Sequence, residues 1–180
     1  MIKTVIHRVR SSHSRWRVLG WGSIGGIIAA PALAMRGTSE FHWTTGDFLF
    51  AAAMLAGVGV AFELLVRARR TWAYRAAVAV ALGAGLLMLW ANAAVGIVGS
   101  ENQSINVWFN LIPLFPLVGA IGVRFRAGAM AIVMAATALA QLLVGAIVQH
   151  YGHFAWVFTL AWTAAWLLSA LLFRKAANQV

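Results

Sequence analysis

Apolar residues fill six stretches of this chain, and most polar residues lie in the short segments between them. A helix that crosses a hydrocarbon core ~30 Å thick needs about 20 predominantly apolar residues. The pattern therefore predicts an all-α fold, an integral membrane bundle of six transmembrane helices joined by short loops. The predicted spans cover residues 18–35, 47–66, 76–98, 105–123, 127–148 and 154–173.

Composition supports a membrane protein without a separate soluble domain. Of 180 residues, 62% are hydrophobic and only 10% are charged, which is too little polar surface for a soluble domain. We expect one transmembrane domain over residues 18–173, preceded by a basic segment, 1–17, and followed by a tail, 174–180. The chain has no cysteine, so disulfides, thiol catalysis and thiolate metal sites are excluded.

Basic residues cluster before the first predicted span, at every second connection between spans, and after the last span. Thirteen of the 14 Lys and Arg residues fall into four clusters, Lys3–Arg17, Arg67–Arg75, Arg124 with Arg126, and Arg174 with Lys175. Because basic residues are retained on the cytoplasmic side, the pattern predicts a bacterial inner-membrane protein with both termini cytoplasmic. The net charge of +10 would suggest nucleic acid for a soluble protein. Beside membrane spans it indicates anionic lipids of the cytoplasmic leaflet as partners, and no nucleic acid.

The basic segment 1–17 has an apolar face opposite its basic residues, which predicts a short amphipathic helix on the inner leaflet. Two alternatives are open. The segment is rich in Arg and Ser, as transit peptides are, and Ala32-Leu33-Ala34 resembles a signal-peptidase site. We favour retention of the segment, because cleavage would leave five spans and an external amino terminus.

Polar side chains inside a membrane are costly and indicate a site. Asn92, Asn110 and Gln141 are predicted to lie in the outer half of the bilayer, and Glu101 in the outer loop above them. We hypothesise that these four residues line an outward-facing pocket that binds a small solute or ion. Asn92 and Gln141 would exchange hydrogen bonds with the ligand, and Glu101 would supply negative charge at the mouth.

The fourth predicted span contains two prolines. Pro113 and Pro116 donate no backbone hydrogen bond, so the carbonyls of Phe109 and Ile112 lose their helical partners. Freed carbonyls bind ions or solutes in the broken helices of transporters. The alternative is a kinked helix whose freed groups are satisfied by neighbouring helices.

The other titratable residues predict no catalytic centre. Glu63 precedes Arg67 by four residues, the spacing of a helical ion pair. His150 and His153, with His42, do not show the spacing of a metal site, so no metal and no cofactor are expected. No nucleotide-binding loop, serine elbow or zinc-protease motif is present.

The segment Trp90–Asn102, WANAAVGIVGSEN, resembles part of an uncharacterised group of small multi-pass inner-membrane proteins of bacteria. The likeness covers most of residues 20–148, whereas the final span has no counterpart and Pro113 and Pro116 depart from the group's pattern. The resemblance implies the membrane topology, and it does not indicate any particular activity. Further similar segments are Gly20-Trp21-Gly22, Trp43-Thr44, Asp47-Phe48, Phe62-Glu63-Leu64 and Tyr74-Arg75-Ala76-Ala77.

These features favour a non-enzymatic protein that binds or transports a small solute or ion. A structural or accessory subunit of a membrane complex is the first alternative, and it implies a second copy or a partner membrane subunit. A membrane-embedded enzyme is the least favoured alternative, and it would need Glu63 or Glu101 beside a histidine. A wide aqueous pore is not expected, because the inner half offers only Glu63 as a polar lining.

Overall fold

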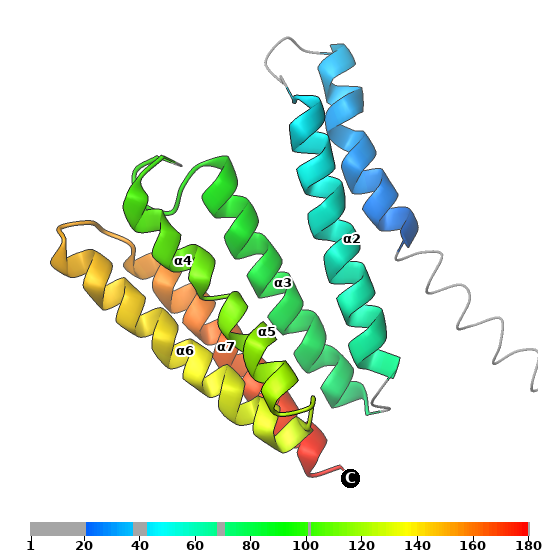
Figure 1. Ribbon diagram of the computed structural model, residues 1–180, viewed down its shortest axis with the longest axis vertical. Helices are drawn as coiled ribbons and strands as arrows, with labels where there is room; N and C mark the ends of the chain where they lie inside the picture. Colours follow the sequence, from blue (N-terminus) through cyan, green and yellow to red (C-terminus); the bar gives the residue numbers. More distant parts are fainter. Residues whose placement is uncertain (1–20, 38–42, 68–70, 101, 180) are drawn as a thin grey trace, which may run out of the picture. The chain divides into compact units, whose positions relative to one another are not determined.

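The computed structural model describes residues 21–37, 43–67, 71–100 and 102–179, with the backbone alone over 64–67 (Figure 1). These residues are helical with short connections and contain no strand. Besides the helix at 21–37, five stretches are long and apolar enough to cross a membrane. The predicted all-α membrane bundle is confirmed. The five stretches are Thr45–Glu63, Trp72–Ala94, Ser104–Gly122, Ala127–His150 and Trp156–Ala177.

The chain divides into two compact units, Met1–Ala61 and Phe62–Val180. The first contains the helix at 21–37 and most of α2, Thr45–Arg67. Thr44 caps α2, because its amide and hydroxyl donate to the Asp47 carboxylate at 2.7 and 2.9 Å. The predicted amphipathic helix of residues 1–17 lies outside the described residues.

The second unit is built around α7, Trp156–Ala177. Helix α6, Ala127–His150, packs along α7, and α3, Trp72–Ala94, packs on another side of α7. Two side chains of α7 donate to α3 carbonyls: Trp162 Nε1 to Ala84 at 2.8 Å and Ser169 Oγ to Ala77 at 2.9 Å. Fully buried large side chains fill the space between the helices, namely Tyr74, Met88, Phe109, Met134, Trp166 and Phe173.

The third predicted span, 76–98, is displaced along the chain, since α3 covers Trp72–Ala94. Thr71 starts the helix early by accepting the Tyr74 amide with its hydroxyl at 3.4 Å. At the other end Gly96 takes a φ of +74°, which is left-handed and ends the helix. Residues 95–98 therefore form a loop and not the last turn of a span.

The fourth span is broken, as its prolines predict. It consists of a short 3-10 helix, η1 (Ser104–Asn106), then α4 (Val107–Leu111) and α5 (Leu114–Gly122). The break falls at Ile112 and Pro113. The Ile112 carbonyl accepts the Phe115 amide at 3.1 Å. The expectation that this carbonyl is free is therefore wrong, because a tighter turn replaces the helical bond.

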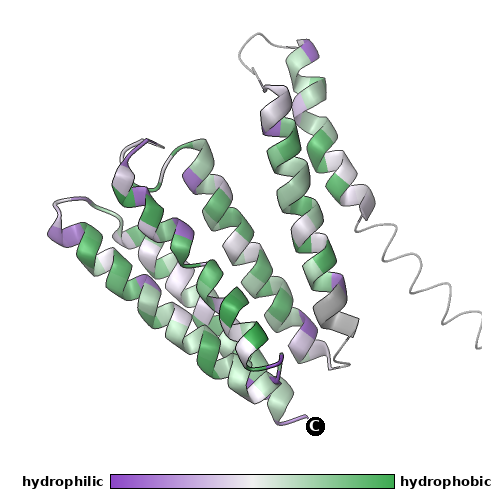
Figure 2. Ribbon diagram, viewed as in Figure 1, coloured by the Kyte–Doolittle hydropathy of each residue, from purple (hydrophilic) through white to green (hydrophobic). Residues whose placement is uncertain are grey.

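Helix α7 continues beyond the predicted span end at residue 173. Arg174 and Lys175 lie in its last turn, where positive charge complements the helix dipole. The Lys175 ammonium lies 4.5 Å from the centre of the Trp72 ring, which is a cation–π contact. In Figure 2 the helices are hydrophobic along their middle turns, and many of their hydrophilic residues lie near helix ends.

Candidate functional site

Basic side chains gather at one end of the second unit. The start of α3, the turn between α5 and α6 and the end of α7 meet there (Figure 1). We call this the basic end; it carries Arg75, Arg124, Arg126, Arg174 and Lys175. The described connections after α3 and α6, residues 95–100, 102–103 and 151–155, lie at the opposite end, which we call the loop end.

At the loop end, Asn92 and Asn110, two of the four hypothesised ligand residues, lie in contact. Asn92 Nδ2 donates to Asn110 Oδ1 at 2.7 Å and to the Asn106 carbonyl at 2.9 Å. Asn92 Oδ1 accepts the Ile97 amide at 3.3 Å. Asn92 is buried, and its amide group is therefore engaged with the protein itself.

Asn106 completes this cluster and was missed by the sequence analysis. Its Oδ1 accepts the Val98 amide at 2.9 Å, and its Nδ2 donates to the carbonyls of Val98 and Ser100 at 3.1 and 2.8 Å. Asn106 thereby satisfies backbone groups that the loop would otherwise leave buried and unpaired. The signal in the sequence was an amide residue directly before the apolar run that forms α4.

Of the remaining hypothesised ligand residues, Gln141 makes no hydrogen bond to the asparagine cluster within the described part of the chain. Gln141 is fully buried on α6, and neither its Oε1 nor its Nε2 has a hydrogen-bond partner. Glu101 lies outside the described residues. Glu63 has an interaction within the described part of the chain, whereas the Arg67 side chain is not described, so this ion pair stays a prediction.

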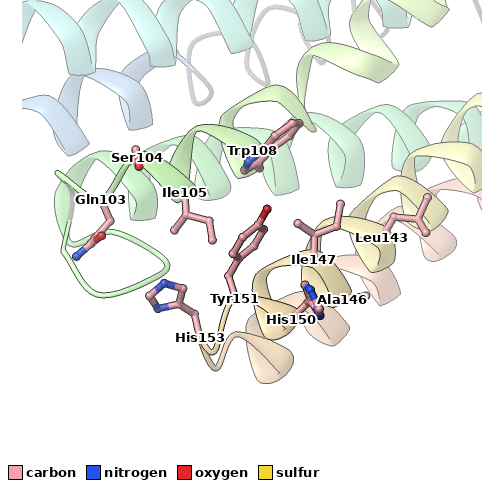
Figure 3. Close-up of a pocket in the computed structure, with 10 residues that line it drawn as sticks. All are labelled: Gln103, Ser104, Ile105, Trp108, Leu143, Ala146, Ile147, His150, Tyr151 and His153. Atoms are coloured by element: carbon pink, nitrogen blue, oxygen red, sulfur yellow. The ribbon is translucent and has the colours of Figure 1, made fainter.

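A groove of about 880 Å³ opens at the loop end between two segments far apart in sequence. We call it the α4–α6 groove. One wall comes from η1 and α4, and the other from the last turns of α6 and the loop after it (Figure 3). Its lining residues are Gln103, Ser104, Ile105, Trp108, Leu143, Ala146, Ile147, His150, Tyr151 and His153.

The lining of the groove is polar at the end near the loops and mostly apolar along the helices. Towards the loops the groove is lined by the polar residues Gln103, Ser104 and His153. Along the helices it presents Trp108 and Leu143, which are 47% and 56% exposed. The arrangement matches an elongated molecule with a hydrogen-bonding head and an apolar body.

The backbone after α6 places His153 and Tyr151 at this groove. Gly152 takes a φ of +82°, and the His153 amide returns to the Val148 carbonyl at 3.2 Å. This turn directs the chain back over the end of α6. Tyr151 is 69% exposed and lies between Ile105 and Ile147, with its hydroxyl directed towards Trp108 (Figure 3).

Within the described ranges, no three His, Asp or Glu side chains are grouped closely enough to hold a metal ion. Comparison of the chain with protein families, with curated proteins and with solved structures finds no match. The groove and the asparagine cluster are therefore the two features of the described chain that bear on function.

Proposed function

We propose that this protein is a non-enzymatic, multi-pass protein of the bacterial inner membrane that binds an amphiphile in the α4–α6 groove. The observation that carries the proposal is the division of one groove into a polar end and an apolar wall. We therefore place the binding site in this groove and not at the asparagine cluster, because the cluster's amides already bond to the protein.

The position of the groove supports a ligand drawn from the bilayer. Both walls are the ends of membrane-crossing stretches, Ser104–Gly122 and Ala127–His150. Trp108 and Tyr151 are amphipathic aromatic residues of the kind that settle at the membrane–water interface. A lipid would place its head against Gln103, Ser104 and His153 and its chain along Trp108, Leu143 and Ile147.

The proposed orientation has the groove on the periplasmic side. The basic end collects five Lys and Arg residues from three separate connections and helix ends, and such residues are retained in the cytoplasm. The basic end would also attract anionic lipids of the inner leaflet. The resemblance of Trp90–Asn102 to bacterial inner-membrane proteins supports the same location.

The orientation is testable with single cysteines, because the chain has none of its own. We expect His153→Cys to react with a membrane-impermeant maleimide in intact spheroplasts. Asn178→Cys should react only after the membrane is opened. The reverse pattern would overturn the orientation and leave amphiphile binding to be judged separately.

Binding is testable by photo-crosslinking in nanodiscs that contain a phospholipid with a diazirine in its acyl chain. We expect labelled peptides from residues 103–108 and 143–153, with labelling that unlabelled lipid competes away. Ile147→Trp fills the apolar wall and should reduce the label several-fold. Ile132→Trp is the matched control, because Ile132 is an exposed isoleucine of the same helix that does not line the groove. Equal labelling of every lipid-facing surface, or no effect of Ile147→Trp, would overturn the proposal.

A further inference from the structure

Among the described residues of the second unit, five buried side-chain polar atoms have no hydrogen-bond partner, and all five belong to α6 or α7. They are Gln141 Oε1 and Nε2, Thr159 Oγ1, Thr163 Oγ1 and Trp166 Nε1. Each of these residues is at least nine-tenths buried. Buried polar groups are nearly always hydrogen-bonded, and each unpaired one is costly, so a cluster of them indicates a partner.

Helix register brings these groups to one place. Gly145 contacts Thr159, since a Cβ on Gly145 would lie 2.6 Å from Thr159 Oγ1. Gln141 lies one turn before Gly145 on α6, and Thr163 lies one turn after Thr159 on α7. Because the two helices run antiparallel, Gln141 and Thr163 face each other at the same level. Trp166 follows one further turn along α7.

The cluster is closed at both ends. Towards the loop end, the close approach of Gly145 and Thr159 leaves no space between α6 and α7. Towards the basic end, the next polar groups are already paired. Thr137 Oγ1 donates to the Val133 carbonyl and Ser169 Oγ to the Ala77 carbonyl, each at 2.9 Å. The unpaired groups of Gln141 and Thr163 therefore lie in one stretch of the α6–α7 interface, and the Trp166 ring extends from α7 towards Gly85 of α3.

We propose that this stretch is an internal hydration site, in which on the order of one or two water molecules bridge Gln141, Thr163 and Trp166. The lining contains donors, Trp166 Nε1–H and the Gln141 amide, together with acceptors, Gln141 Oε1 and the threonine hydroxyls. None of these groups is charged, so neither a cation nor an anion finds a counter-charge among them. Water fits because it both donates and accepts, and typically makes about three such bonds.

Synchrotron radiolysis of the protein in nanodiscs tests this proposal. An X-ray pulse produces hydroxyl radicals from water, and these oxidise side chains in contact with that water. We expect Trp166 to be oxidised despite its burial, several-fold more than Phe173. Phe173 is the matched control, as it is an equally buried aromatic residue of α7 packed edge-on against Tyr74. Protection of Trp166 equal to that of Phe173 would show that no water contacts its ring, which overturns the proposal.

Two variants test the assigned partners. Gln141→Leu and Thr163→Val keep the approximate shape of each side chain and remove its hydrogen-bonding groups. Either change should reduce oxidation of Trp166 several-fold and lower the melting temperature, because the water loses a partner. Unchanged labelling, or a higher melting temperature, would overturn the proposal. A higher melting temperature would mean that the buried group was dry and unpaired, because removing such a group stabilises the protein. If one variant does not fold, the other variant and the wild-type comparison still decide.

Discussion

The hydroxyl of Tyr74 donates a hydrogen bond to the backbone carbonyl of Phe125, 51 residues further along the chain, at 3.1 Å. The bond joins the first turn of α3 to the turn between α5 and α6. That turn is unusual, because Arg124 and Phe125 both have positive φ, 51° and 56°. Tyr74 is buried and its ring packs edge-on against Phe173 of α7. One side chain therefore connects three elements at the basic end.

Tyr74→Phe should lower the free energy of unfolding by about 1 kcal/mol, since it removes the hydroxyl and leaves the Phe125 carbonyl without this donor. SDS-induced unfolding in detergent micelles measures the change. Tyr151→Phe, at a tyrosine that is 69% exposed, is the control and should leave stability unchanged. Equal effects of the two substitutions would show that the bond contributes nothing.

Arg124→Gly should raise the free energy of unfolding by about 1 kcal/mol, because glycine adopts a φ of 51° without the clash that a Cβ suffers. The Arg124 side chain is exposed, so little packing is lost. Arg126→Ala removes the same charge two residues later, where φ is −72°. That control should not stabilise the protein, and a gain in both variants would assign the effect to charge and not to backbone strain.

Asn106→Asp should destabilise the second unit by about 2 kcal/mol, because the carboxylate loses the Nδ2 donor and faces the carbonyls of Val98 and Ser100. Thermal unfolding in micelles measures the loss. Hydrogen exchange at the Val98 amide should also speed up, since its acceptor is disturbed. Gln103→Glu makes the same change of charge on an exposed residue of the same loop and should have little effect on stability. Slow exchange at Val98 in Asn106→Asp would contradict the assigned role.

Gly145→Ala should cost on the order of 2 kcal/mol, because its Cβ would overlap the Thr159 side chain and force α6 and α7 apart. Thr159→Ala in the same chain should recover part of the loss, since the overlapping atoms are those of Thr159. Gly83→Ala is the control: no atom lies within 4 Å of its Cβ position, so the better helix former should stabilise α3 slightly. A neutral Gly145→Ala would mean that the helices separate freely at this level.

The membrane-spanning helices were predictable because each carries its own signal. A run of about 20 apolar residues identifies a span whatever its neighbours are, and Pro113 located the break in the fourth span without any tertiary information. The end of α3 was not predictable in the same way. Val95–Val98 is as apolar as the helix before it, and its loop is held by the side chains of Asn92 and Asn106, which accept the Ile97 and Val98 amides.

The candidate site was predicted in part. Counting residues along the helices put Asn92, Asn110 and Gln141 at a similar depth, and Asn92 bonds Asn110, but depth says nothing about direction around a helix axis. Gln141 lies one turn before Gly145, which contacts Thr159 of α7, whereas Leu143, Ala146 and Ile147 on the same helix line the groove. The groove joins residues about 40 positions apart, and His153 reaches it only through the turn at Gly152. Such features depend on packing and are absent from a linear pattern.

The extension of α7 to Ala177 provides a site at which a larger protein could be fused for electron microscopy. A helical partner fused directly after Ala177 would continue the same helix, with the rise of about 1.5 Å per residue that a continuous helix has. The contact between Lys175 and Trp72 ties that last turn to α3, so the fused partner would be held rigidly to the second unit. The fused partner would project beyond the detergent micelle and allow the particle images to be aligned.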